Sequence, residues 1–415
     1  MNIEIPYLNG IETIDLDNSK IEQIIQPNSV ESGDEKNILT QAIRYPVNGP
    51  EFRNFVRNRR HILLIVNDAT RPTPTHLVLQ IILPMLEGNR FSILIATGTH
   101  RAPTEEEYRI IFRSLREPLK DNILVHNAWS SPFFLLGKTR YGNEIRLNSL
   151  MTEADAIIPI GSIEPHYFAG YTGGRKSFMP GLADYDCITR NHKLALSPQA
   201  QPGALKGNPV AEELEDAEEL LMKRFEIFSV VSVLDRNHKI YAAAAGNLGE
   251  SFQNMIRKAD EIYMVPVERK SDIVVTIASE PTDIDLYQAH KAIENGRLAL
   301  KEGGIIILVA GCRDGIGPRT FFDMLTAGST CEAVLEKLKD KYQLGYHKAG
   351  KLAELNLRSE VWAVTSLDPH LVRSAHIRPF DNVSEAIRAA IREKGEDAKI
   401  TFIMDGGHTV PKLMK

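Results

Sequence analysis

Apolar runs alternate with segments of helical periodicity along most of the chain, and this alternation predicts the fold class. The run His61–Val66 is apolar after its first residue and stops at Asn67, so it predicts a buried strand. A segment with helical spacing, Thr75–Leu86, follows it, and a second apolar run, Phe91–Ala96, comes next. Strands that are apolar on both faces and are separated by helices are typical of a parallel sheet covered by helices.

The stretch after the second run carries the signals of a helix start. Thr104 stands before three acidic residues, Glu105–Glu107. This is the arrangement expected of an N-cap followed by a first turn that complements the helix dipole. Ile123–Val125 and Ala154–Ile160 are expected to be further strands of the same sheet.

A short polar N-terminal region precedes the first predicted strand. The alternation of strands and helices restarts in the second half of the chain, after the polar stretch Pro266–Lys270. Strands are expected at 272–278, 304–310, 361–365 and 399–404, and helices at 286–300, 321–355 and 383–392. A chain of 415 residues also exceeds the size at which single cores stop growing. We expect an α/β protein of two domains with largely parallel sheets and an active-site cleft between them. Residues 1–268 would carry the catalytic groups, and residues 269–415 would contribute substrate-binding groups.

Composition and charge exclude several classes of protein. The formal net charge of -5, without a basic tail, argues against a nucleic-acid binder. Cys187, Cys312 and Cys331 are too few and too scattered for a disulfide framework or a cysteine-rich metal site. The N-terminus lacks the basic and apolar regions of a secretion signal, and no apolar run has membrane-spanning length. We expect a cytoplasmic protein that binds neither nucleic acid nor a membrane.

Polar clusters follow several of the predicted strands. Asp68–Pro74 and Gly98–Arg101 follow the first two, and Ser279–Asp283 and Gly311–Gly317 follow strands of the second half. Ligands of open α/β sheets bind beyond the carboxyl ends of the strands. Repeated clusters at this position favour an enzyme over a scaffold.

The segment Pro165–Ser177 has an unusual mixture of residues: His166, several glycines and the pair Arg175-Lys176, with His192 downstream. Glycines let backbone N–H groups approach a ligand, the cations can neutralise a phosphate or carboxylate, and imidazoles can move protons or hold a metal. The segment is close to a phosphate-binding P-loop, but Arg175 stands where that motif requires glycine. The mixture indicates a ligand site.

Three further candidates each have a structural alternative. Arg71, held in a loop by two prolines, suits a bidentate grip on a carboxylate, and a loop-stapling ion pair is an equal alternative. His100 suits proton transfer near neutral pH, or is a capping or surface histidine. Gln288 and Lys291, beside Tyr287, share a helical face that can grip a substrate's oxygen atoms or face solvent.

Taken together, these motifs resemble the nickel-pincer lactate racemase family. The resemblance is carried by Asp68-Ala69-Thr70-Arg71-Pro72-Thr73-Pro74, Thr97-Gly98-Thr99-His100-Arg101, Pro165-His166 through Lys176, Arg190-Asn191-His192, Gly207-Asn208-Pro209 and Tyr287-Gln288-Ala289-His290-Lys291. Each motif is modest alone, but their order and spacing are specific and cover most of the chain. Thr172 stands where many members have serine, and it keeps the hydroxyl.

The resemblance implies a covalently tethered cofactor. In this family, pyridinium-3,5-bisthiocarboxylic acid mononucleotide, the nickel-pincer nucleotide, clamps nickel with one carbon and two sulfur atoms. Lys176 matches the tethering lysine, and His192 matches the fourth nickel ligand, which suits a square-planar site. Further cofactor contacts are implied for Asp68, Thr70, Gly173, Gly174 and Arg175.

The resemblance also implies the acid–base and substrate groups. His100 and His166 match histidines that alternate as general base and acid, with Asp68 supporting a catalytic histidine. The residues that match substrate-binding groups are Arg71, Tyr287, Gln288 and Lys291.

The implied function is racemisation or epimerisation of a 2-hydroxy acid, either lactate or a larger hydroxy acid or sugar acid. One histidine removes the hydroxyl proton as hydride leaves C2 for the cofactor, and the planar 2-keto acid receives the hydride on its other face. Proteins that make the cofactor are implied as partners. A phosphoryl-transfer or nucleotide-binding enzyme using Gly170–Lys176 is the first alternative, and a non-catalytic carboxylate-binding protein is the second.

Overall fold

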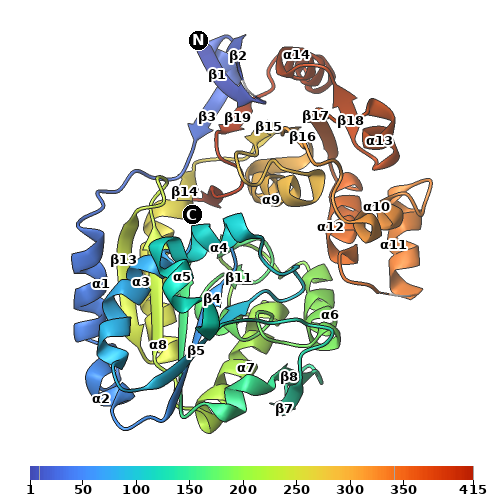
Figure 1. Cartoon of the computed structure of the whole chain (residues 1–415). Coiled ribbons are helices and arrows are strands. Elements are labelled where there is room, and N and C mark those ends of the chain that lie inside the picture. The colour runs from blue at the N-terminus through green and yellow to red at the C-terminus, as the bar shows by residue number, and fades with distance from the viewer. Residues whose placement is uncertain (9, 341, 415) are drawn as a thin grey trace. The chain divides into compact units, whose positions relative to one another are not determined.

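The computed structural model describes residues 1–8, 10–340 and 342–414 (Figure 1). This part of the chain divides into two compact units. The inserted unit is Ser29–Ile262, and the split unit is Met1–Asn28 together with Tyr263–Lys415. Both units are layered α/β structures with largely parallel sheets, so the predicted fold class is confirmed.

The sheet of the inserted unit has the strand order β13-β12-β9-β4-β5-β6. Its strands pair in parallel, except that β13 runs antiparallel to β12. The bounds are β4 (His61–Asn67), β5 (Arg90–Ala96), β6 (Ile123–Val125), β9 (Ala156–Ser162), β12 (Ser229–Leu234) and β13 (Ile240–Gly246). Ile62, Leu64 and Val66 of β4 enter the core with apolar residues of the covering helices.

The helices of the inserted unit begin where local signals place them. Thr104 caps α4 through a capping box with Glu107, as its sequence predicts. The bounds are α1 (Glu35–Arg44), α2 (Phe52–Val56), α3 (Thr75–Ile82), α4 (Glu105–Phe112), α5 (Arg116–Leu119), α6 (Tyr185–Lys193), α7 (Pro209–Arg224) and α8 (Leu248–Tyr263). Within the described residues, no helix is long and apolar enough to cross a membrane.

Two hairpins lie outside this sheet. One consists of β7 (Phe133–Lys138) and β8 (Glu144–Asn148), and the other of β10 (Pro165–His166) and β11 (Gly170–Tyr171). The second hairpin follows β9 directly, so it places His166 close to the carboxyl end of a central strand.

The sheet of the split unit has the order β18-β17-β16-β15-β19-β3, and its strands pair in parallel. The bounds are β3 (Ile21–Ile25), β15 (Ser271–Ile277), β16 (Leu300–Val309), β17 (Glu360–Val364), β18 (Arg378–Phe380) and β19 (Ile400–Ile403). Smaller sheets are formed by β1 (Asn2–Tyr7) with β2 (Gly10–Asp15), and by β14 (Met264–Val267) with β20 (Val410–Leu413). The helices are α9 (Leu286–Gly296), α10 (Arg319–Leu325), α11 (Cys331–Asp340), α12 (Tyr346–Asn356), α13 (Pro369–Ser374) and α14 (Val383–Lys394).

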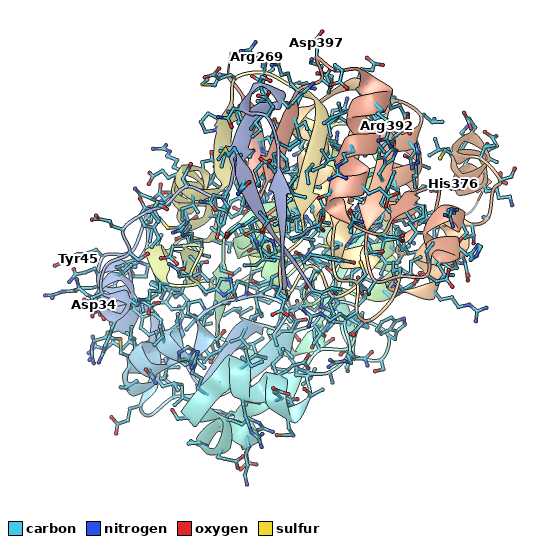
Figure 2. All side chains as sticks on the ribbon, turned by 90° about the horizontal axis from the view of Figure 1, so that it is seen from above. Asp34, Tyr45, Arg269, His376, Arg392 and Asp397 are labelled. Carbon is cyan, nitrogen blue, oxygen red and sulfur yellow. The ribbon has the colours of Figure 1, made fainter. Side chains whose placement is uncertain are left out.

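Helices α14 and α9 cover opposite faces of this sheet (Figure 1). Val383 and Ile387 of α14 pack with Ile273, Val275 and Ile277 of β15, whereas α9 approaches the alternate residues Val274 and Thr276. The side of α14 away from the sheet is polar, and Arg392, labelled in Figure 2, is exposed. Alternation along β15 therefore gives each helix its own apolar face.

The first 28 residues belong with the C-terminal half of the chain, which differs from the predicted division at residue 268. The strand β3 pairs with β19 and forms an edge of the split unit's sheet, and Ile3, Ile5 and Ile14 join its core. The short polar N-terminal region of the sequence analysis thus contains three strands. The pairing partner of β3 lies near the other end of the chain, so no local pattern announces it.

Candidate active site

Asp68 and His100 meet at one edge of the inserted unit's sheet because they follow neighbouring parallel strands. The register of β4 with β5 pairs Asn67 with Ala96. Gly98 has a positive φ of 55° and turns the chain after β5. His100 Nδ1 then lies 2.7 Å from Asp68 Oδ2. The two strand-end clusters of the inserted unit therefore come together.

The Asp68 carboxylate is buried, and both of its oxygens accept hydrogen bonds. Oδ1 accepts from the backbone N–H and the hydroxyl of Thr70, at 3.1 and 2.6 Å. Burial, the largest single influence, raises the pKa of Asp68, but the hydrogen bonds of His100 and Thr70 and the charges of His100 and Arg71 together lower it below its ordinary value. Asp68 is therefore ionised near neutral pH.

The ionised carboxylate sets the tautomer of His100. Asp68 can only accept, so Nδ1 of His100 donates to it. In a neutral imidazole, Nε2 then carries the lone pair. The side chain is 52% exposed, so this nitrogen has the accessibility of a general base.

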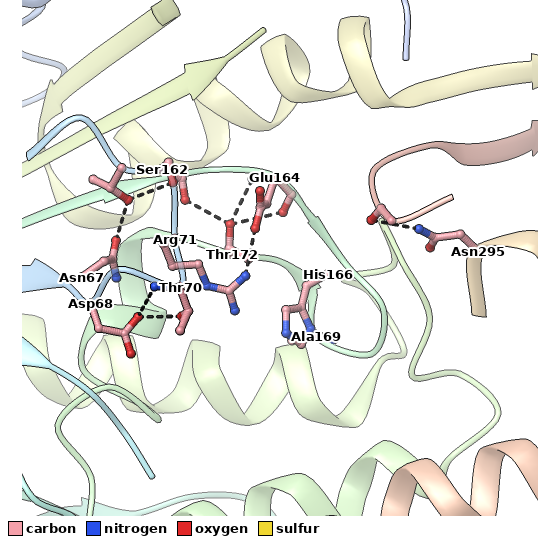
Figure 3. A network of polar contacts seen from close by, with 12 residues as sticks. Asn67, Asp68, Thr70, Arg71, Ser162, Glu164, His166, Ala169, Thr172 and Asn295 are labelled. Carbon is pink, nitrogen blue, oxygen red and sulfur yellow. Dashed lines mark hydrogen bonds and ion pairs between the residues drawn. The ribbon is translucent and has the colours of Figure 1, made fainter. Parts of the chain in front are cut away.

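Arg71 forms an ion pair with Glu164, which the sequence analysis did not single out. Nη1 of Arg71 lies 2.9 Å from Oε1 of Glu164, and the two side chains are 25% and 13% exposed. Figure 3 shows the guanidinium reaching from the loop after β4 to Glu164 on the segment after β9. A guanidinium has five N–H donors, and this bond engages one of them. Pairing and carboxylate binding are thus compatible for Arg71.

His166 is held in the β10–β11 hairpin, where it pairs with Gly170. Its Nδ1 accepts the backbone N–H of Ala169 at 3.3 Å. Because Nδ1 is an acceptor here, Nε2 carries the proton. Gly170 has a φ of 78°, and a Cβ at this position would lie 2.3 Å from the Ala204 carbonyl oxygen, so the hairpin needs glycine.

Thr172 ties this hairpin to the end of β9 (Figure 3). Its Oγ1 donates to the Ser162 carbonyl oxygen at 3.0 Å and accepts the Glu164 N–H at 3.0 Å. The Thr172 N–H donates to the Glu164 carbonyl oxygen at 2.8 Å. Both the backbone N–H and the carbonyl oxygen of Glu164 are therefore held by Thr172.

Lys176 stands in the short 3₁₀ helix η6 (Gly174–Ser177), just after Gly173. Gly173 has a φ of 77°, and a Cβ there would lie 2.7 Å from the Ser162 carbonyl oxygen. A Cβ on Gly174 would lie 3.2 Å from the Phe252 ring. Close packing against β9 and α8 thus accounts for both glycines.

Phe168 is the common neighbour of three predicted site residues. Its ring centroid lies 5.6 Å from Lys176 Nζ, 4.6 Å from the His166 ring and 5.1 Å from the His192 ring. Both imidazoles contact it edge-on, at 87° and 70°. Residues as far apart in the sequence as His166 and His192 are thereby gathered around one buried ring.

His192 lies near the end of α6, with its side chain half-buried. Burial, followed by the charge of Lys176, lowers the pKa of His192 to about 3, so its imidazole is neutral at physiological pH. Asn191 beside it donates to Glu213 Oε2 of α7 at 2.9 Å, which holds this turn of α6 in place. Among the described residues, no group of three or more histidine, cysteine or carboxylate side chains is arranged to hold a metal.

Arg175 points into the inserted unit. Its guanidinium is 6% exposed, lies 3.5 Å from Glu218 of α7 and packs 4.9 Å from the Phe252 ring centroid. Burial lowers the pKa of Arg175, and the charge of Glu218 opposes this. The carboxylate of Glu218 therefore balances the charge of Arg175, the residue that stands where a P-loop requires glycine.

Tyr287, Gln288 and Lys291 lie on α9 of the split unit. Asp285 caps this helix by accepting the Gln288 N–H at 2.6 Å. Lys348 of α12 places its ammonium 3.7 Å from the Tyr287 ring centroid and donates to the Tyr287 carbonyl oxygen. Burial, then the charge of Lys291, lowers the pKa of Lys348 well below its ordinary value. The three predicted substrate groups thus share a helix that packs against the buried Lys348 side chain.

Sequence reasoning missed Glu164, Phe168 and Lys348. Glu164 and Phe168 lie inside or beside the segment it did examine, but a carboxylate and a ring among histidines and glycines carry no signal of their own. Their importance comes from contacts with residues elsewhere in the chain.

Comparison with family models connects both halves of the chain to one kind of enzyme. Residues 7–203 match the model described as "Lactate racemase N-terminal domain", and residues 267–410 match "Lactate racemase C-terminal domain".

Individual proteins agree with these matches. The lactate racemase of Thermoanaerobacterium thermosaccharolyticum is 30% identical over 422 residues, which cover 98% of each chain. The lactate racemase of Lactiplantibacillus plantarum is 31% identical over 386 residues, or 90% of each chain. The solved apoprotein of the Thermoanaerobacterium enzyme superposes with a TM-score of 0.92 over 99% of this chain and 100% of that one.

Proposed function

The chain belongs to the lactate racemase family of isomerases, and on this premise we propose that it interconverts the stereoisomers of a 2-hydroxy acid with a lysine-tethered nickel-pincer nucleotide. Lactate, a larger hydroxy acid or a sugar acid is the substrate class. The cofactor is made by separate biosynthetic proteins, which are therefore partners in its loading.

One observation carries the proposal: Lys176, His166 and His192 all contact the Phe168 ring. An amine for the tether, an imidazole for the metal and an imidazole for proton transfer are the three groups that this chemistry requires near one another. Their common neighbour supports a single site for all three.

The donor chemistry of this cluster fits the cofactor. A neutral imidazole is the form of histidine that binds a metal, and the low pKa of His192, about 3, provides it. Lys176 would hold the nucleotide through its Nζ, and His192 would complete the ligands of nickel. When bound, the cofactor supplies a hydride acceptor for C2 of the substrate.

The remaining steps fall to side chains of this protein. Arg71 binds the substrate carboxylate, and Tyr287, Gln288 and Lys291 are proposed to complete substrate binding. Nε2 of His100 takes the hydroxyl proton, since Asp68 holds Nδ1 as the donor. His166 acts as the acid once it is protonated on both ring nitrogens: it then donates from Nε2 to the product oxygen, and its Nδ1 gives up the bond from Ala169. The two histidines exchange these roles for the opposite stereoisomer.

The test is peptide mass spectrometry across Lys176, with nickel quantified, on protein co-produced with the cofactor pathway. We expect a mass adduct on Lys176 and bound nickel, together with loss of optical rotation in a solution of one lactate enantiomer or another 2-hydroxy acid. His192→Ala is expected to keep the adduct but to lower nickel retention, because a metal ligand is lost.

Lys193→Ala is the matched control, since this exposed lysine lies beside His192 without contributing to the cluster. It should retain both the adduct and nickel. An unmodified Lys176 without nickel, in the presence of a working pathway, would overturn the proposal. Binding of nucleoside triphosphate at the same loop would then favour the phosphoryl-transfer alternative.

A further inference from the structure

Glu164 stands where the loop of Arg71 meets the hairpin of His166. Its side chain is mostly buried, and its Oε1 lies 2.9 Å from Arg71 Nη1. A pair with so little exposure is screened weakly by solvent, so removal of one partner leaves a poorly solvated charge on the other. The contact is therefore a strong constraint on where the Arg71 guanidinium points.

The carboxylate is also attached to an unusually well-fixed backbone. The Glu164 N–H donates to Thr172 Oγ1, and its carbonyl oxygen accepts from the Thr172 N–H. The same hydroxyl donates to Ser162 at the end of β9. The end of β9 thus holds Thr172, Thr172 holds the backbone of Glu164, and the side chain of Glu164 holds Arg71 (Figure 3).

Arg71 has less support from its own loop. Its backbone N–H donates to the Asp68 carbonyl oxygen at 3.3 Å, a long bond. A long side chain in a loop loses much rotamer entropy when it binds a ligand, unless another group has already ordered it. Glu164 provides that order before any substrate arrives.

We propose that Glu164 is a positioning residue, which orients the guanidinium of Arg71 for the substrate carboxylate and balances its charge. This inference rests on the proposed function, in which Arg71 binds that carboxylate. The bond to Glu164 uses one N–H of the fork and directs the remaining donors. Glu164 itself neither touches the substrate nor moves a proton.

The experiment compares Glu164→Ala and Glu164→Gln in cofactor-loaded enzyme that racemises its substrate. Glu164→Ala is expected to raise KM about tenfold or more and to change kcat far less, because orientation of a binding group affects ground state and transition state alike. Glu164→Gln is expected to restore a KM within about threefold of wild type, because its amide oxygen still accepts from Arg71. Glu144→Ala is the control, since Glu144 pairs with Arg146 in an exposed contact of 3.0 Å.

A double-mutant cycle separates positioning from folding. Arg71→Ala with Glu164→Ala should have a KM no higher than that of Arg71→Ala alone, because Glu164 no longer helps binding once Arg71 is gone. An unchanged KM in Glu164→Ala would overturn the inference, as would equal damage by both Glu164 variants with a lowered Tm. Either result leaves the proposed function intact, whereas a loaded wild-type enzyme without racemase activity would refute that function instead.

Discussion

The two histidines proposed as acid and base have opposite surroundings. His100 stands on an open loop, half exposed, and its Nδ1 faces an ionised carboxylate 2.7 Å away. His166 is buried in a hairpin, stacks against Tyr167 and accepts a backbone N–H at its Nδ1. The carboxylate requires a donor at Nδ1, and the N–H requires an acceptor there.

The difference shows how two identical side chains become complementary. The partner of one ring nitrogen decides what the other nitrogen offers, so neutral His100 presents a lone pair at Nε2 and neutral His166 presents a hydrogen-bond donor there. His100 can therefore act as the base as it stands, whereas His166 must take up a second proton before it can act as the acid. Variants that remove or weaken the surroundings of either histidine test this contrast.

Removal of either imidazole should have the largest effect. His100→Ala and His166→Ala are each expected to lower turnover by about 10²- to 10⁴-fold, the range of general acid–base catalysis, while nickel content stays unchanged. Racemisation by polarimetry and metal analysis check both parts. His370→Ala, at an exposed position, is the control. Substantial residual activity in either variant would refute the two-base assignment.

Asp68→Asn should remove the tautomer preference that distinguishes His100 from His166, while both imidazoles remain. The amide no longer demands a donor at Nδ1, so the base tautomer of His100 is no longer favoured, and kcat should fall about 100-fold. Asp235→Asn is a matched control, because Asp235 is also a buried carboxylate of the inserted unit. A normal kcat in Asp68→Asn would show that the tautomer is set by another group.

The free energy of unfolding should depend on pH through the same carboxylate, that of Asp68. The pKa of Asp68 in the folded protein lies below its ordinary value of 3.8, so its ionised form stabilises the fold. That contribution is present above the unfolded pKa and is lost as the pH falls through the folded pKa. Urea unfolding from pH 7 to pH 3 should show a smaller acid-induced loss in Asp68→Asn than in wild type. An equal loss would contradict this assignment.

Gly170→Ala should disturb the hairpin that holds His166 and leave the surroundings of His100 unchanged. The new Cβ would meet the Ala204 carbonyl oxygen at 2.3 Å, so the hairpin must shift and kcat should fall about tenfold, with about 1–3 kcal/mol of stability lost. Gly207→Ala is the matched control, since Gly207 has a φ of 77° and a Cβ added there would meet no atom within 4 Å. Its cost should be only the strain of about 1–2 kcal/mol. Similar kcat values in the two variants would contradict the clash.

The smallest effect should be a difference between the two directions of the unmodified enzyme. When His166 acts as the base, its Nδ1 must give up the Ala169 N–H, a bond worth about 0.5–1.5 kcal/mol, so kcat should be about 2- to 10-fold lower in that direction. For enantiomers the equilibrium constant is one, so kcat/KM must be equal and KM must change with kcat. Initial rates from each pure enantiomer measure this. Equal kcat values would mean that the Ala169 bond plays no part.

Local signals in the sequence were sufficient for much of the fold. The strand predicted at Ile123–Val125 has those bounds, and Thr104 caps α4 as expected. The pairing of β3 with β19 was not predictable, because its two halves lie at opposite ends of the chain. The expected polar N-terminal region was therefore wrongly separated from the sheet it completes.

In the site, too, local features could be predicted from the sequence, whereas contacts between distant segments could not. The sequence placed Asp68 and His100 after two strands, but only the family resemblance implied that Asp68 supports a catalytic histidine; their contact follows from the pairing of β4 with β5, whose ends lie at one edge of the sheet. The partner of Arg71 lies 93 positions away, and no spacing argument selects Glu164 among the carboxylates of the chain. The roles proposed for the histidines, Lys176 and the α9 residues remain predictions for the experiments above.

The position of β3 also determines when its sheet can be completed during synthesis on the ribosome. Gln23 pairs with Thr401, so this N-terminal strand emerges long before its neighbour exists. At about 5–20 residues per second, roughly 20–75 s pass between the two. The whole inserted unit is translated within that interval and can fold first, while the earliest residues of the chain wait with an unpaired strand edge. The N-terminal strand can therefore join its sheet only after the last strand of that sheet has been made.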